Sequence, residues 1–468
     1  TITLETDILL DAPLPGITST VIIEGQGHTV DGNNDPDVGS VLTIGIYGNF
    51  TLNEATVTGG NSHYGGGIAN LWWSGTLIVN NSTISGNSVS SGDHHRQRAL
   101  GGGIYNRGTL VLTNSTVSGN SIPYINGEGE WAKGGGIYNE GDLTLTNSTV
   151  NSNSVACGND QGQMAGGGGI GNWADDNTTF TLTNSTVSDN SAVCERTQGQ
   201  TAYGGGIENR GDMAVTLNNS KIIGNSAGHG GGIANFGSII VNNSTISGNA
   251  AAASFGEGGG IYNLNGEFTL INSTVSGNTA DSGHGGGIAN FGSIIVNNST
   301  ISGNSADYAG GIYNLRSAIT LSSSIVSGNT ATTKGNEVYN YDSSNIIVNS
   351  YNLFGHSGET NDRAFYDFTP GSTDITATSD GTNPTALSAI LSPLADNGGP
   401  TMTHALVPGS PAIDLDADCS TGLTEDQRGY PRPEAEGTGC DAGAFEGSVS
   451  PVNNNTFLPA IYLLLLNQ

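Results

Sequence analysis

The sequence predicts an all-β fold, a right-handed single-stranded parallel β-helix of three sheets, and two repeated phrases indicate it. The first is a six-residue phrase of the form GGGIYN, which recurs along most of the chain. The second follows it, as in LVLTNSTVSGN at 110–120, where apolar residues alternate with Thr, Ser and Asn as in half-buried strands. Copies lie 24 to 37 residues apart, and because so short a unit cannot bury a core alone, neighbouring copies must stack.

Each copy of the first phrase combines glycines, a β-branched residue and a closing Asn. In the unit at 101–120, short apolar stretches surround Ile104, Leu110 and Val117, which predicts three strands per turn and a triangular coil. The copies occupy 65–70, 101–106, 134–139, 167–172, 204–209, 230–235, 258–263, 285–290 and 309–314, with a degenerate copy at 335–340.

Asparagine recurs at three fixed places in each unit. Because Asn tolerates left-handed backbone and stacked amides can pair along the coil axis, we interpret all three as structural, including the NST phrase that matches a glycosylation sequon. The triple glycines predict a crowded or left-handed corner. The first set follows the glycines (Asn106, Asn139, Asn172, Asn209, Asn235, Asn263, Asn290), the second begins NST (Asn81, Asn114, Asn147, Asn184, Asn243, Asn272, Asn298) and the third closes SGN (Asn87, Asn120, Asn153, Asn190, Asn225, Asn249, Asn278, Asn304).

Four consecutive insertions of equal length predict a side lobe. They lie between the SGN-type Asn and the next triple glycine, and they are 13 residues long at 88–100, 121–133, 154–166 and 191–203. Cys157 and Cys194 each stand ten residues before their triple glycine. Equivalent places on adjacent turns are about 4.8 Å apart, a distance that suits a disulfide between them.

Composition excludes several classes of protein. A net charge of −29, with only 12 Lys and Arg, disfavours nucleic acid and anionic membranes as partners, although calcium is a cation such a surface could attract. No other cofactor is expected. Four cysteines without a CxxC spacing fit two disulfides and an oxidising compartment. No run of 18 apolar residues exists for a membrane span, and the start at Thr1 without Met suggests a leader that has been removed or left out.

The pattern divides the chain into four parts: an N-terminal cap with the first coils at 1–60, the repeat β-helix at 61–345, an irregular region at 346–446, and a linker with an apolar tail at 447–468. The irregular region contains SPLADNGGPTMTHALVPGSPAID (392–414), DQRGYPRP (426–433) and CDAGAFE (440–446). These phrases resemble the conserved end of the choice-of-anchor Q family of bacterial surface proteins. The repeats resemble those of pectate-lyase-like β-helices and polymorphic outer-membrane proteins.

The resemblance implies a secreted or cell-surface protein, extracellular in either case, with a bridge between Cys419 and Cys440. It implies no chemistry. The resulting fold prediction is a three-sheet solenoid with an irregular, disulfide-bonded C-terminal region.

No constellation of residues predicts catalysis, and we assign no catalytic residue and no metal ligand. Asp175 and Asp176 are adjacent, so on a strand they would point to opposite faces and make a poor acid–base pair. His229 and His284 belong to GHG phrases two turns apart, too far to share a metal. The group Asp93, His94 and His95 is interpreted as part of a solvated loop.

Aromatic side chains and the tail are the candidate binding elements. Tyr105, Tyr138, Tyr262 and Tyr313 take the outward position of the first strand, and Trp173, Phe236 and Phe291 follow the first Asn set, so these rings could stack on sugars. The alternative, which we favour, is packing against neighbouring turns or the lobe. The apolar tail could pack as a strand on its own coil, pack on a neighbouring subunit, or be a processed sorting signal. The candidate subunit contacts in it are Phe457, Leu458, Ile461, Tyr462, Leu463, Leu464, Leu465 and Leu466.

These observations leave three hypotheses for function. The first is a non-catalytic extracellular structural protein that associates with itself head to tail through the ends of the β-helix and the apolar tail, as an open contact that propagates into filaments. The second is a monomeric adhesin or glycan-binding surface protein. The third and weakest is a polysaccharide lyase or hydrolase.

Overall fold

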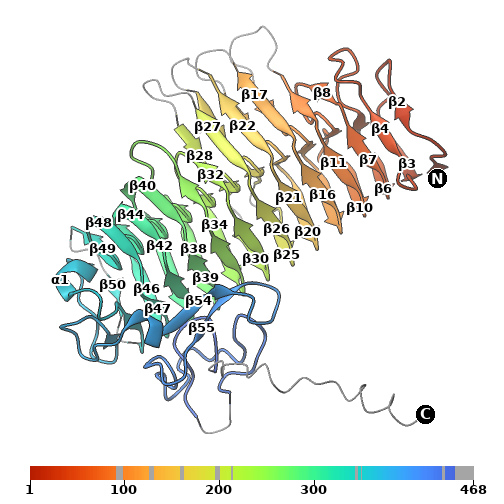
Figure 1. Ribbon diagram of the computed structural model, residues 1–468. Coiled ribbons are helices and arrows are strands. Elements are labelled where there is room, and N and C mark those ends of the chain that lie inside the picture. Colours follow the sequence, from red (N-terminus) through yellow and green to blue (C-terminus); the bar gives the residue numbers. More distant parts are fainter. Residues whose placement is uncertain are drawn as a thin grey trace, which may run out of the picture.

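The computed structural model describes residues 1–90, 98–125, 131–158, 163–175, 177–194, 201–211, 214–342, 346–348, 350–434 and 438–447. These residues form a long stack of β-coils, with an irregular C-terminal region beside the last coils (Figure 1). The strand pairs in the stack are parallel, and those of the three long sheets are in register from one turn to the next, as for Leu77, Leu110 and Leu143. The predicted parallel β-helix is therefore confirmed.

Each full turn contributes strands to three long sheets. The turn at 104–118 contains β14 (Ile104–Asn106), β15 (Thr109–Thr113) and β16 (Thr116–Ser118), at the three predicted places. In the described residues, sheet A has 13 strands from β1 (Ile2–Thr3) to β50 (Ile346–Ile347), sheet B has 14 from β2 (Ile8–Leu9) to β53 (Ile375–Thr376), and sheet C has 12 from β5 (Leu42–Ile44) to β52 (Phe365–Tyr366). The sheets thus continue beyond residue 345.

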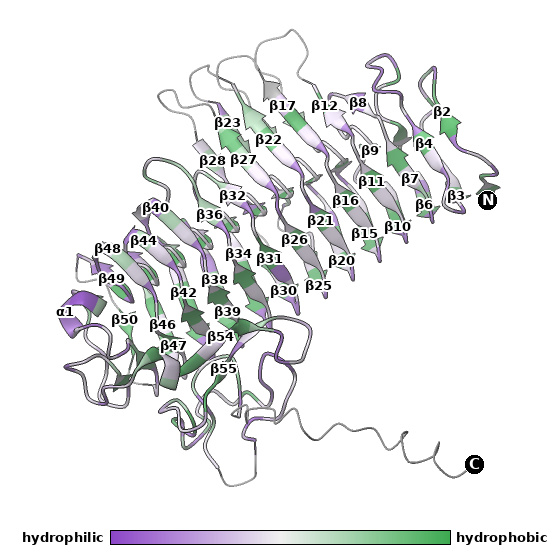
Figure 2. Ribbon diagram, viewed as in Figure 1, coloured by the Kyte–Doolittle hydropathy of each residue, from purple (hydrophilic) through white to green (hydrophobic). Residues whose placement is uncertain are grey.

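The core is a column of Leu, Ile, Val and Phe side chains that point inward from these three sheets. Alternate residues of one strand, such as Leu110 and Leu112, are completely buried, while Val111 between them faces outward. Figure 2 shows most apolar residues along the strands. Burial of the same residue type at the same place on every turn favours one register, since a one-residue slip would turn every core side chain outward.

The described parts of the four equal insertions form the predicted side lobe. Two sheets of short strands contribute to it. Sheet D has ten strands from β8 (Asn61–Ser62) to β48 (Thr330–Lys334) and extends beyond the lobe, and sheet E has four strands. Small and β-branched side chains such as Val89, Ile122 and Ala165 fill the space between them. Cys157 and Cys194 pair in register on adjacent turns, 4.7 Å apart at Cα, and are disulfide-bonded as predicted. The strands of sheet E are β13 (Arg98–Leu100), β18 (Trp131–Lys133), β23 (Met164–Gly166) and β28 (Thr201–Tyr203).

Two of the three Asn sets form buried ladders of side-chain hydrogen bonds. On each turn the Nδ2 amide donates to the Oδ1 atom of the equivalent Asn on the next turn. The first ladder runs from Asn70 to Asn340 with donor–acceptor distances of 2.7–3.0 Å. The other runs from Asn87 to Asn329 with distances of 2.8–3.0 Å. The amides therefore satisfy one another's buried polar atoms at corners where the triple glycines leave little space.

The NST asparagines have a different role, because they adopt the left-handed backbone that the sequence predicted. From Asn81 to Asn298 their φ angles lie between 43° and 51°. The first glycine of each triple is also left-handed, as Gly101 is at φ 70°. At the third glycine a side chain would collide with the ladder, since a Cβ on Gly103 would lie 2.9 Å from Asn120 Cγ.

The C-terminal region folds back along the coil and docks on the outer face of sheet B (Figure 1). A hairpin of β54 (Leu391–Ala395) and β55 (Thr403–Leu406) begins it. Gln427 is buried at the interface: its Nε2 donates to Thr245 Oγ1 (3.0 Å), and its Oε1 accepts from Thr274 Oγ1 (2.6 Å). These hydrogen bonds join Gln427 to turns of the coil more than 150 residues earlier in the chain.

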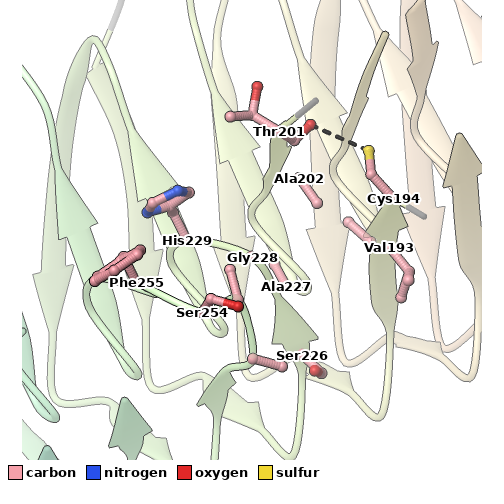
Figure 3. Close-up of a pocket in the computed structure, with 13 residues that line it drawn as sticks. Val193, Cys194, Thr201, Ala202, Ser226, Ala227, Gly228, His229, Ser254 and Phe255 are labelled. Carbon is pink, nitrogen blue, oxygen red and sulfur yellow. Dashed lines mark hydrogen bonds between the residues drawn. The ribbon is translucent and has the colours of Figure 1, made fainter. Parts of the chain in front are cut away.

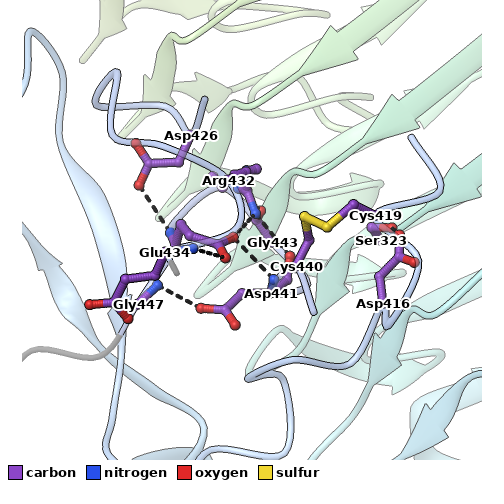
Figure 4. Close-up of polar contacts among 12 residues, drawn as sticks. Ser323, Asp416, Cys419, Asp426, Arg432, Glu434, Cys440, Asp441, Gly443 and Gly447 are labelled. Atoms are coloured by element: carbon purple, nitrogen blue, oxygen red, sulfur yellow. Dashed lines mark hydrogen bonds and ion pairs between the residues drawn. A yellow bond between two sulfur atoms is a disulfide. The ribbon is translucent and has the colours of Figure 1, made fainter. Parts of the chain in front are cut away.

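Two of the three phrases that carry the family resemblance, at 426–433 and 440–446, pair with each other inside this region (Figure 4). Arg432 Nη1 donates to Glu446 Oε2 (2.7 Å) and to the Asp441 carbonyl (2.9 Å). Cys419 and Cys440 are disulfide-bonded, 5.1 Å apart at Cα, as the resemblance implied. The two disulfides of the chain suggest a compartment outside the reducing cytoplasm. No helix in the described residues is long and apolar enough to cross a membrane.

Acidification is expected to weaken the contact between the C-terminal region and sheet B, through protonation of His404. Its Nε2 lies 2.8 Å from Ser276 Oγ on sheet B, and burial lowers the pKa of His404 below its ordinary value of 6.5. As the pH falls, the unfolded state therefore binds this proton first. The contribution of neutral His404 to stability is complete above about pH 6.5 and is lost as the pH falls through the lowered pKa. We expect His404→Gln to flatten this part of the pH dependence, as measured by urea unfolding from about pH 7.5 to pH 5.

The exposed His63→Gln is the matched control, and it should leave the profile of the native chain unchanged. An identical pH profile for native chain and His404→Gln would contradict the role given to His404.

Candidate functional site

The predicted outward row of tyrosines is buried, which corrects its assignment as an exposed glycan-binding row. Tyr105, Tyr138, Tyr262 and Tyr313 are only 3–7% exposed. The rings stack on one another along the coil, as Tyr105 and Tyr138 do at a centroid distance of 5.7 Å, and Leu100 of the lobe packs against them. Burial raises the pKa of Tyr313 to about 12. The row therefore serves packing, the alternative favoured from the sequence.

Trp173 belongs to a neighbouring buried ion cluster rather than to a binding row. It is half-buried and stacks on Trp131 at 5.0 Å. Below it, Lys133 Nζ donates to both carboxylate oxygens of Glu208 (2.6 and 2.7 Å), and Arg210 Nε donates to Glu208 Oε1 (2.6 Å). Lys133 and Glu208 lie two turns apart, and they meet because Gly166 on the turn between them has no side chain to obstruct them.

An exposed cluster of aromatic residues that the sequence analysis missed lies near the N-terminal end. We define the aromatic patch as Ile46, Tyr47, Trp72, Trp73 and Arg107. The three rings are 77%, 46% and 53% exposed for Tyr47, Trp72 and Trp73. Among the described residues, the only other aromatic side chains classed as exposed are Tyr64, Phe255, Tyr341 and Tyr430. The available signal was a Trp pair after GGGIAN, where most other copies have a single large residue and a glycine.

Three consecutive corners between sheets C and A hold the aromatic patch together. Hydrogen bonds link the first two corners, since Tyr47 N donates to Ser74 Oγ (3.2 Å) and Thr76 N donates to the Gly48 carbonyl (2.9 Å). On the third corner, the Arg107 guanidinium lies over the Trp73 ring at 4.8 Å from its centroid. This cation–π contact restricts the Trp73 ring, which lies in the same row of corners as Tyr47 and Trp72.

Polar groups border the aromatic patch. Arg107 Nε lies 3.6 Å from Glu140 Oε2, and Glu140 also accepts hydrogen bonds from Tyr105 and Tyr138. The Arg107 side chain remains 42% exposed, so its outer nitrogens face solvent beside Trp73. The patch thus combines apolar ring faces with a hydrogen-bond donor and a nearby acceptor.

A groove of about 830 Å³ lies at the end of the side lobe (Figure 3). It exists because sheet E ends at β28, since the next insertion is only four residues long (226–229). Its lining is mostly small and apolar, with Phe255 exposed at its rim and Cys194 Sγ against the Thr201 carbonyl (3.4 Å). Among the described residues that line it, His229 is the only titratable side chain.

The two GHG histidines are on alternate turns, and a carboxylate lies between them. Glu257 is 3.7 Å from His229 Nδ1 and 3.5 Å from His284 Nδ1. Burial lowers the pKa of His229, and the charge of Glu257 opposes that shift. The His284 ring stacks on Tyr313 and the His229 ring packs at a tilt against Tyr262 of the buried row, which gives these residues a packing role.

The remaining candidates from the sequence have separate outcomes. Asp175 is exposed, while Asp176, the loop with Asp93, His94 and His95, and the tail residues 457–466 lie outside the described residues. One group that the sequence analysis did not select could hold a metal ion: Glu337, His356 and Glu359.

No family model matches the chain, and no curated protein or solved structure is significantly similar to it. The resemblance to the choice-of-anchor Q family therefore stays a prediction.

Proposed function

We propose that this chain is an extracellular rod that binds a neutral polysaccharide through the aromatic patch. The observation that carries the proposal is the pair of exposed indoles, Trp72 and Trp73, held next to Tyr47 on two adjacent corners. Exposed aromatic faces stack on the apolar faces of sugar rings, and Arg107 with Glu140 can hydrogen-bond the hydroxyl groups at the ring edges.

The charge of the chain favours a neutral ligand. At a net charge of −29, the rod repels uronic-acid and sulfated polymers at a distance, and Arg107 is the only cation of the patch. Sheet A begins beside the patch and has few charged outward residues, so a chain of neutral sugars can approach along it without crossing a charged surface.

Removal of the two indoles is expected to abolish binding. We expect the native chain to be retained in affinity electrophoresis through gels that contain neutral glucans, mannans or xylans, and Trp72→Ala/Trp73→Ala to migrate as in a ligand-free gel. Each exposed aromatic contact of this kind contributes about 1 kcal/mol or more, and because the two act together the affinity should fall at least tenfold.

The matched control is Phe255→Ala, which removes a still more exposed ring from the groove at the end of the lobe. This control should be retained like the native chain. Equal retention of the native chain and the Trp72→Ala/Trp73→Ala variant would contradict the proposal, as would lack of retention by every neutral polymer.

Self-association into a structural filament is a second candidate, favoured by a separate observation. The first turn exposes Ile2, Ile8, Leu9 and Leu14, and its strands β1 and β2 are the outermost strands of sheets A and B. Unpaired parallel edges of this kind accept further strands. Negative-stain electron microscopy of the chain with and without residues 457–468 separates the candidates: filaments that vanish on truncation would support this one, and single rods in both samples would contradict it.

A further inference from the structure

On the last regular turn of the coil, one Asn ladder ends at a carboxylate instead of at another amide. Glu337 occupies the place of the third glycine in the degenerate phrase GNEVYN. Its Oε2 accepts a hydrogen bond from Asn329 Nδ2 (2.6 Å), and its Oε1 accepts from Gly328 N (2.8 Å). Glu337 thus replaces the amide that a further turn would have supplied, and its side chain is completely buried.

A second buried carboxylate and an imidazole face it. Ligand atoms of Glu337, His356 and Glu359 all lie within 4.8 Å of one another. The Glu359 side chain is 3% exposed; its Oε2 accepts from Asn336 Nδ2 (2.7 Å), while its Oε1 is buried without any hydrogen-bond partner and lies 3.9 Å from His356 Nε2. An unpartnered buried carboxylate oxygen that points at an imidazole is costly unless something binds between them.

Apart from His356, no basic side chain lies within ion-pair distance of either carboxylate in the described part of the chain. Arg363, the nearest candidate in sequence, donates instead to the carbonyls of Ala331, Thr332 and Thr333. Burial and the adjacent Glu359 raise the pKa of Glu337 well above its ordinary value. Two buried carboxylates so close together require either a shared proton or a cation.

We propose that Glu337, His356 and Glu359 bind a divalent transition-metal ion, of which Zn²⁺ is the best match, at the C-terminal end of the ladder. One imidazole with two carboxylates is a ligand set for zinc, whereas calcium takes oxygen ligands almost alone. Three protein ligands leave one position for water. Binding requires one local change, because Gly358 N now donates to His356 Nδ1 (3.0 Å) and an imidazole bound through Nε2 carries its proton on Nδ1.

Zinc titration of the full chain, after dialysis against a chelator, tests this site. We expect isothermal titration calorimetry and metal analysis to give one tight ion per chain, and Co²⁺ in its place to show the visible absorption of a site with a nitrogen ligand. Glu359→Gln and His356→Ala should each weaken binding at least tenfold and abolish the Co²⁺ spectrum. His63→Ala, which removes an exposed histidine elsewhere, should change neither.

The two variants are compared with the native chain by circular dichroism, so that a misfolded protein is not mistaken for a loss of ligands. Equal zinc affinity for Glu359→Gln and the native chain would overturn the proposal. A native chain that binds no zinc, and whose Glu359→Gln variant melts at a higher temperature, would overturn it in favour of a shared proton. Neither result bears on polysaccharide binding, because the aromatic patch lies near the opposite end of the rod.

Discussion

Glu208→Ala is expected to lower the free energy of unfolding by about 3–5 kcal/mol, because it leaves Lys133 as an uncompensated buried charge. Lys133 is 1% exposed, and Glu208 is the only carboxylate within ion-pair distance of it in the described residues. Even with that partner, burial lowers the pKa of Lys133 to about 8. Urea unfolding at neutral pH measures the loss.

A double variant separates the ion pair from simple loss of packing. Lys133→Met with Glu208→Gln removes both charges and keeps their approximate volumes, and Arg210 keeps its contacts with the faces of Trp173 and Phe236. Replacement of a buried pair by groups of similar size is often nearly neutral. We therefore expect the double variant to be more stable than Glu208→Ala. If the free energy of unfolding of Glu208→Ala lies within about 0.5 kcal/mol of that of the native chain, the role given to this ion cluster is contradicted.

Asn190→Ala is expected to open the coil locally, because one amide of the ladder satisfies groups on both neighbouring turns. Its Oδ1 accepts from the backbone N and the Nδ2 of Asn153 (3.0 and 2.9 Å), and its Nδ2 donates to the Val150 carbonyl (2.9 Å) and to Asn225 Oδ1 (2.9 Å). Each buried group left without a partner costs about 1–3 kcal/mol, so the total should reach about 3 kcal/mol or more.

Hydrogen exchange followed by mass spectrometry is the suitable measurement, because turns of a solenoid can open locally. Peptides that cover 149–153 and 186–190 should exchange at least tenfold faster, while those at 270–278 should be unchanged. The matched control is Asn184→Gly, which replaces an exposed asparagine at φ 51° on the same turn by a residue that accepts this backbone. Equal exchange in Asn190→Ala and this control would contradict a supporting role for the ladder.

The repeat made the regular part of the molecule predictable. Period-two alternation identified the three strands of each turn, and equal spacing placed Cys157 and Cys194 side by side, because every turn repeats the same constraint. The fixed Asn positions predicted both the ladders and the left-handed turn. Such conclusions need only the position of a residue within its own unit.

Features that depend on residues far apart in the sequence were not predictable. The tyrosine row was placed correctly on the outward face of its strand, but the lobe and the neighbouring rings that bury it belong to other segments. Lys133 meets Glu208 only because the intervening turn has Gly166, and Gln427 reaches Thr245 only because the C-terminal region folds back. The period of a strand fixes which face a side chain takes, not what covers that face.

The central claim is that the aromatic patch binds neutral polysaccharide, and tryptophan fluorescence tests it most directly. The chain has four tryptophans, and Trp131→Phe/Trp173→Phe leaves only Trp72 and Trp73 as reporters. We expect the emission of this variant to shift and saturate as a retained polysaccharide is added, with an affinity equal to that of the native chain. Unchanged emission while the polysaccharide still binds would place the binding site elsewhere and contradict the account.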